Sequence, residues 1–196
     1  MDIATWDTIF GLCIGLGLAA SCGFRVFVPL LVVSVAAKSG HLVLSESFAW
    51  LESWPAIIGF GAATALEVSA YYVPWVDNLL DTISAPAAVV AGTIATAACV
   101  ADMDPMLQWA VGIIAGGSVA GAVNFGSSSV RATSTLTTAG LGNFGVATAE
   151  LAISSVLSVI SILVPVLAAV LVIVAITLVA RLVLRRWNRP TSMSAV

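Results

Sequence analysis

The fold of this chain is decided by residues 11–30, which read GLCIGLGLAASCGFRVFVPL. Small residues recur here at every fourth position: Gly11, Gly15, Ala19 and Gly23. Such a stripe lies on one face of a helix and lets a second helix approach closely, which is a common basis of helix association in lipid. The stretch therefore predicts a tightly packed membrane helix, interrupted near residues 23–29 by Arg25 and Pro29.

The same spacing returns 101 residues later, at Gly112, Gly116, Ala120 and Asn124. An arginine, a glutamate and a proline-led apolar run then follow each stripe in the same order. We predict two related halves, residues 8–103 and 104–187, although such spacing also arises by chance in helices rich in glycine and alanine. Halves of three spans each form an inverted 3+3 repeat, an arrangement that recurs in transporters.

Composition indicates an all-α membrane protein. Hydrophobic residues make up 60% of the 196 residues and charged residues 9%, against about 25% charged in a soluble domain. The mean hydropathy is +1.11. We predict a single membrane domain, residues 1–196, built as a polytopic transmembrane helical bundle of about six spans. A net charge of −3 with scattered acidic residues indicates no nucleic-acid partner.

Hydrophobic runs and their breaks predict the individual spans. The expected spans lie near residues 8–37, 54–74, 83–101 and 106–125, followed by a run over 149–187 that Pro165 divides. Residues 126–148 are rich in Ser, Thr and Gly and contain Arg131. Because polar backbone at membrane depth must be buried in protein or line a cavity, we expect this stretch to be broken or re-entrant.

Tryptophan and arginine positions predict the orientation. The six tryptophans fall at the ends of predicted segments: Trp6, Trp50, Trp54, Trp75, Trp109 and Trp187. Four arginines cluster near the carboxyl end, at 181, 185, 186 and 189. By the positive-inside rule, the chain is expected to be a multi-pass protein of the inner or plasma membrane whose tail, residues 188–196, is cytoplasmic.

The sequence offers little for catalysis or metal binding. His41 is the single histidine, and the three cysteines lie in apolar runs without a Cys-x-x-Cys pair. Residues 15–20, GLGLAA, match a dinucleotide fingerprint only formally, because the motif needs a preceding strand. We therefore expect no metal, no cofactor and no enzyme activity, with an intramembrane enzyme as the least favoured alternative.

Arg25, Glu67, Arg131 and Glu150 are the leading site candidates, because a charge at the bilayer centre costs about 3 kcal/mol on insertion scales. We expect Arg25 to pair with Glu67 and Arg131 with Glu150. Glu67 is either a structural carboxylate or a proton or cation site, and Glu150 can also cap a helix start. Each arginine can instead receive an anionic ligand, since guanidinium groups bind carboxylate and phosphate in a bidentate manner.

Further polar residues complete the candidate site. Ser128, Thr135 and Asn143 lie in the hydroxyl-rich stretch around Arg131. The hydroxyls of this stretch either contact a solute or ion or satisfy irregular backbone. Asp77 and Asp81 stand four residues apart on one helix face near a predicted interface. They form either a cation entrance or an ordinary solvated face.

The order of these landmarks resembles a known family. The resemblance rests on residues 15–30, Leu66-Glu67, residues 73–77 and the stretch from Arg131 to Glu150 with its Gly140-Leu-Gly-Asn143 turn. On these residues the chain resembles a bacterial membrane family, domain of unknown function 4126. The resemblance implies an integral membrane protein and carries no activity with it.

Two functions fit these observations. The first is a small transporter or channel-like permease for an ion or a small polar or anionic solute, using a charged site at the membrane midplane. The second is a non-transporting scaffold or accessory subunit whose charge pairs are structural. A wet cavity at Glu67 and Arg131 favours transport, and dry, fully paired charges favour the scaffold. A chain this short encloses little volume, so we expect a homo-oligomer, a dimer or larger, in the lipid bilayer.

Overall fold

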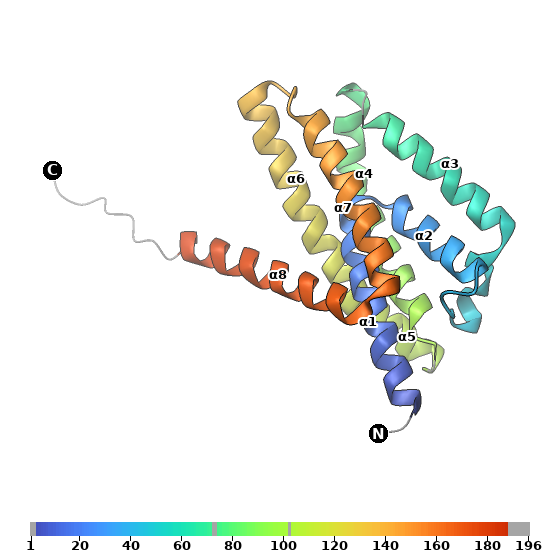
Figure 1. Ribbon diagram of the computed structural model, residues 1–196. Helices are drawn as coiled ribbons and strands as arrows, with labels where there is room; N and C mark the ends of the chain where they lie inside the picture. The colour runs from blue at the N-terminus through green and yellow to red at the C-terminus, as the bar shows by residue number, and fades with distance from the viewer. Residues whose placement is uncertain (1–2, 72–73, 102, 188–196) are drawn as a thin grey trace.

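The computed structural model describes the backbone of residues 3–71, 74–101 and 103–187, and the side chains of residues 5–71, 83–101 and 103–181 (Figure 1). The α-helices are α1 (Ile3–Phe24), α2 (Phe27–Lys38), α3 (Trp54–Ala70), α4 (Pro74–Cys99), α5 (Pro105–Val111), α6 (Ser118–Thr138), α7 (Asn143–Leu163) and α8 (Pro165–Trp187). A 3-10 helix, η1 (Glu46–Glu52), precedes α3, and a π-helix, η2 (Gly112–Gly117), joins α5 to α6. The all-α expectation is confirmed over these described ranges.

Three described segments are long and apolar enough to cross a membrane, Thr5–Phe24, Pro105–Thr138 and Asn143–Leu163. Shorter apolar helices accompany them: Phe27–Lys38, Trp54–Ala70, Ile83–Cys99 and Pro165–Arg181. Together with the composition, these helices make the chain a membrane protein. Figure 1 shows α8 leaving the bundle sideways, whereas α1, α4, α6 and α7 lie together.

Proline and a polar side chain set several helix starts. Ser53 Oγ accepts a hydrogen bond from the Ala56 N–H at 3.3 Å at the start of α3. Asp104 Oδ1 accepts one from the Met106 N–H at 2.9 Å, with Pro105 as the first residue of α5. Such caps satisfy backbone donors that have no partner within the helix. Pro165 begins α8, which confirms the predicted division of the last apolar run.

Helix α4 is held between the two glycine stripes. A Cβ built on Gly11 would lie 2.2 Å from the Cys99 carbonyl oxygen, and one on Gly112 would lie 2.7 Å from the Thr93 carbonyl oxygen. A side chain therefore does not fit at either glycine. Because lipid supplies no hydrophobic force between helices, this backbone-to-backbone approach is what lets α4 pack against α1 and η2.

The two stripes run in the same direction. Gly11 faces Cys99 and Gly15 faces Thr96, so α1 is antiparallel to α4. Along the second stripe, the residue numbers on α4 also decrease as those of the stripe increase: Ala97 lies beside Gly112 and Val89 lies beside Gly121. Since η2 and α6 are thus also antiparallel to α4, they are parallel to α1. The inversion that we expected between the stripes is wrong for these helices, and their common origin stays a prediction.

The two stripes are parallel because α2 turns back alongside α1 and does not continue in the same direction. Residues 31–41 of α2 and the loop after it lie beside residues 159–163 of α7. Residues nearer the start of α7 lie beside the end of α1, where Ser154 Oγ donates to the Ser21 carbonyl oxygen at 3.0 Å. The chain then reaches the far end of α4, where the Ser45 N–H donates to the Ala98 carbonyl oxygen at 2.9 Å. The first apolar run is therefore a helical hairpin that reverses at Arg25.

Residues 126–148 are broken, as expected, and the break lies between two helices. They form the end of α6, a short turn and the start of α7, and the turn contains Ala139 and Gly140 at positive φ, 54° and 87°. The hydroxyl groups bond back to their own helix, as when Thr133 Oγ1 donates to the Ser129 carbonyl oxygen at 2.9 Å. Because these hydroxyl groups find hydrogen-bond acceptors on the backbone of their own helix, the polar stretch remains helical.

Gly11→Ala is expected to lower the free energy of unfolding by about 1–3 kcal/mol, the usual cost of overpacking. The new Cβ would meet a backbone atom of α4, which cannot rotate away. Gly59→Ala in α3 is the matched control, because a Cβ there meets open space and alanine favours a helix. Thermal unfolding in detergent, followed by tryptophan fluorescence, measures both. An unchanged midpoint for Gly11→Ala would contradict the close packing of α1 on α4.

Candidate functional site

A buried cluster forms where five helices meet. Arg25 stands at the joint between α1 and α2, Tyr71 follows the end of α3, Arg131 lies on α6 and Glu150 lies on α7. Arg25, Arg131 and Glu150 are 2%, 3% and 4% exposed. The structure thus brings three of the four leading candidates into one site, together with an aromatic ring.

Arg131 and Glu150 form the predicted ion pair. Arg131 Nε donates to Glu150 Oε1 at 3.0 Å, and Arg131 Nη2 donates to Glu150 Oε2. Ser127 Oγ also donates to Glu150 Oε1. Ser127 and Arg131 are four residues apart and share one face of α6, so both reach the same carboxylate.

The pairing expected between Arg25 and Glu67 is wrong. Arg25 Nη2 lies 3.6 Å from Glu150 Oε2 and donates to the Ala147 carbonyl oxygen at 2.8 Å. One carboxylate therefore faces two arginines. Arg25 Nε and Nη1 are buried and have no hydrogen-bond partner.

Glu67 instead binds the start of α2. Its Oε1 accepts the Val26 N–H at 2.8 Å and its Oε2 accepts the Phe27 N–H at 3.1 Å. The first donors of a helix have no partner within it, and the helix dipole favours a negative charge there. Because the chain reverses at Arg25, these donors are buried, and Glu67 satisfies them from α3. This contact favours the structural interpretation of Glu67.

Tyr71 lies beneath both guanidinium groups. The Cζ atoms of Arg25 and Arg131 are 3.8 Å and 4.1 Å from the centre of its ring. An aromatic face attracts a cation, most strongly where water is excluded. The ring therefore stabilises two positive charges that share a single carboxylate.

Thr135 and Asn143 lie next to this cluster. Thr135, one turn beyond Arg131, donates from Oγ1 to the Arg131 carbonyl oxygen at 3.0 Å and accepts from Asn143 Nδ2 at 3.0 Å. The hydroxyl that reaches Glu150 is that of Ser127, not of the predicted Ser128. The side chains of Asp77 and Asp81 lie outside the described part of the chain.

Sequence reasoning missed Tyr71, and it placed Ser127 among the hydroxyls around Arg131 without choosing it as a site residue. Both stand four residues from a candidate that was found, Tyr71 after Glu67 and Ser127 before Arg131. Residues four apart share a helix face. Helical spacing from each charged residue was therefore the signal that could have found them.

The cluster lies far from one tryptophan belt. Trp6, Trp54 and Trp109 stand near the starts of α1, α3 and α5, and each is about half exposed or more. Counting from each tryptophan gives 19 residues to Arg25, 17 to Tyr71 and 22 to Arg131, or about 26–33 Å at 1.5 Å per residue. A hydrocarbon core is also about 30 Å thick, and the midplane position of the cluster stays a prediction. Trp75 and Trp187 have no described side chains.

Comparison with known proteins gives one match. The family model for a domain of unknown function, DUF4126, matches residues 12–185. The chain belongs to the DUF4126 family. No curated protein and no solved structure matches it.

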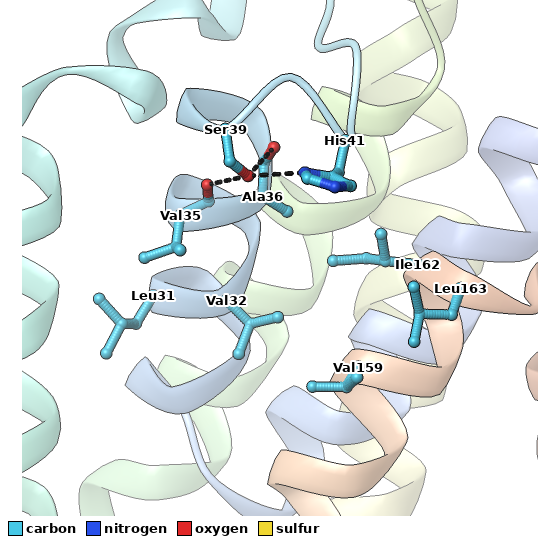
Figure 2. A pocket seen from close by; sticks show the side chains of 9 residues that line it. All are labelled: Leu31, Val32, Val35, Ala36, Ser39, His41, Val159, Ile162 and Leu163. Carbon is cyan, nitrogen blue, oxygen red and sulfur yellow. Dashed lines mark hydrogen bonds between the residues drawn. The ribbon is translucent and has the colours of Figure 1, made fainter.

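The DUF4126 protein also has an apolar groove away from the charged cluster. The groove, of about 400 Å³, lies between α2 and α7 (Figure 2). Its lining residues are Leu31, Val32, Val35, Ala36, Ser39, His41, Val159, Ile162 and Leu163. The polar groups at one end bind one another, with His41 Nδ1 3.0 Å from Ser39 Oγ. Its lining is therefore suited to an acyl chain or an apolar helix and not to a charged solute. In the described part of this DUF4126 chain, no three His, Cys, Asp or Glu residues gather as metal ligands.

Glu67→Gln is expected to destabilise the DUF4126 fold by about 1–3 kcal/mol, the cost of leaving a buried donor unpaired. The amide NH₂ of glutamine would face one of the two backbone N–H groups that the carboxylate accepts. Amide hydrogen exchange at Val26 and Phe27 should therefore speed up. Glu52→Gln, at an exposed position in η1, is the control. Equal exchange rates in the two variants would show that Glu67 does not cap α2.

Proposed function

We propose that this protein is a small membrane transporter or channel-like permease for a small polar or anionic solute, with the charged cluster as its solute site. The supporting observation is Arg25, a fully charged side chain whose Nε and Nη1 have no hydrogen-bond partner although they are buried. Buried polar groups in native proteins are nearly always bonded. Unpaired donors on an arginine are therefore a place where an anion can bind.

A line of hydroxyl groups leads away from the cluster between α1 and α7. Ser154, Ser158 and Ser161 follow Glu150 on the buried face of α7, and Ser21 faces them from α1. Because charged and polar groups inside a membrane usually face one another or a solute pathway, this line is the proposed route from the cluster toward the tryptophan end.

The proposed setting is the inner or plasma membrane, with a cytoplasmic carboxyl terminus and a homodimer or larger assembly. Large apolar residues of α8 are about half exposed, including Leu171, Ile173 and Val174. Such a face suits lipid or a second copy. The predicted tail, residues 188–196, lies outside the described residues.

A membrane scaffold is the second candidate, and the burial of the charges favours it. Glu150 is bonded by Arg131 and Ser127, and Ser154, Ser158 and Ser161 each donate to a backbone carbonyl. In that case the cluster fixes the register of the helices and moves nothing.

Reconstitution in liposomes distinguishes these functions. Arg25→Gln should reduce the flux of a transported anion about ten- to hundredfold, because a hydrogen bond to a charged group contributes about 1.5–3 kcal/mol. Nitrate, chloride, phosphate and acetate are the test solutes. Arg181→Gln, at an exposed position on α8, is the control. Wild-type flux in the Arg25→Gln protein would show that Arg25 is not part of the solute site, and no flux of any solute in the wild type would favour the scaffold.

Fusions at the carboxyl terminus test the proposed orientation. A green fluorescent protein joined after Val196 should fluoresce, and alkaline phosphatase joined there should be inactive, because the arginines near this end are expected to remain in the cytoplasm. Whole-cell fluorescence and phosphatase activity measure the two outcomes. Active phosphatase with a dark fluorescent fusion would reverse the orientation.

A further inference from the structure

We propose that the groove between α2 and α7 is a binding site for one phospholipid molecule, with an acyl chain in the groove and the phosphate at Lys38. The groove lies away from the charged cluster, so this inference does not depend on the proposed permease function. It gives an occupant to the apolar groove of Figure 2.

The groove is apolar along most of its length and open at the surface. Four apolar side chains of α2 and three of α7 line it, and Val35, Val159 and Leu163 are about half exposed or more. Its volume of about 400 Å³ falls within the usual range of small-molecule sites, about 300–1,000 Å³. An apolar group can therefore enter it from the surrounding lipid.

The groove is polar at one end. There Ser39 Oγ donates to the Val35 carbonyl oxygen at 2.9 Å, and His41 Nδ1 lies 3.0 Å from the same Oγ. Figure 2 shows this pair beyond Val35, with Leu31 and Val159 toward the other end. The lining thus changes from polar to apolar along its length, as a phospholipid does from its headgroup to its acyl chains.

The polar end lies at the tryptophan end of the bundle. Lys38 is exposed, and its Nζ lies 5.9 Å from the centre of the Trp54 ring at the start of α3. Exposed tryptophans mark the level of the lipid headgroups. Lys38 follows Leu31 and Val35 by seven and three residues, so it shares their face of α2. Its ammonium group can therefore meet a phosphate whose acyl chain lies in the groove.

The length of the groove fits one acyl chain better than a membrane-crossing helix. Its lining on α2 runs from Leu31 to Ser39, a distance of about 12 Å at 1.5 Å per residue. One leaflet contributes about 15 Å, half of a hydrocarbon core. A helix of a second copy would need contacts along about 30 Å to pack across the whole core. The groove is therefore matched to a lipid of the leaflet on the tryptophan side.

The phosphate is the part of the headgroup that the site recognises. The described charges here have both signs, because Glu46 and Glu52 of η1, which packs against α2, are exposed like Lys38. A lysine binds phosphate as a point charge, and all phospholipids carry this group. We therefore expect zwitterionic and anionic phospholipids to bind, and diacylglycerol with the same acyl chains to bind more weakly.

Native mass spectrometry of the full chain, delipidated in detergent, tests the site. The probes are phosphatidylglycerol, phosphatidylethanolamine and diacylglycerol with identical acyl chains. One phospholipid per chain should bind before any further lipid. Lys38→Gln should weaken this first binding about fivefold, the usual contribution of one lysine to the binding of anionic lipid. Lys38→Arg should retain it, because a guanidinium group also binds phosphate.

Two substitutions on α7 form a matched pair that tests the groove. Val159→Trp fills the groove, whereas Val156→Trp places the same ring at an exposed position outside its lining. Val159→Trp should weaken the first binding at least tenfold, and Val156→Trp should leave it at the wild-type level. Equal binding by the two variants, or equal affinity for phospholipid and diacylglycerol, would overturn the proposal. Loss of dimers in Val159→Trp with unchanged lipid binding would also overturn it and assign the groove to a second copy.

Discussion

The shared carboxylate of Glu150 is the interaction on which the rest of the structure depends. It bonds Arg131 from α6, faces Arg25 at the end of α1, and lies on α7, so three helices meet at one group. Tyr71 adds the end of α3 through its ring. Removing one partner of a buried ion pair leaves an uncompensated charge and usually costs several kcal/mol. The cluster therefore fixes the relative height of these helices.

Close backbone packing brings those helices near enough for the cluster to form. Gly11 and Gly112 let α4 lie directly against α1 and η2, and Asn124 Nδ2 donates to the Gly23 carbonyl oxygen at 3.2 Å just below Arg25. In lipid, packing and polar contacts replace the hydrophobic effect as the cause of helix association. The small residues and the buried charges thus both hold the helices together in lipid, the first by close packing and the second by polar contacts.

The two acidic residues have different physical roles. Glu67 accepts hydrogen bonds from the backbone N–H groups of Val26 and Phe27 at the start of α2, so its charge stabilises the fold. Glu150 is bound by the side chains of Ser127 and Arg131, so its charge joins α7 to α6. One carboxylate therefore satisfies backbone donors, and the other pairs with charged side chains of neighbouring helices.

The sequence alone determined that this is an all-helical membrane protein with a break at Pro165, because hydrophobic runs and proline act locally. It also determined the Arg131–Glu150 pair, since the two residues lie on consecutive helices joined by a short turn. The tertiary structure alone decided the partners of Arg25 and Glu67 and the parallel course of the glycine stripes. All three follow from the reversal at Arg25, where burial of the first donors of α2 requires a carboxylate from another helix.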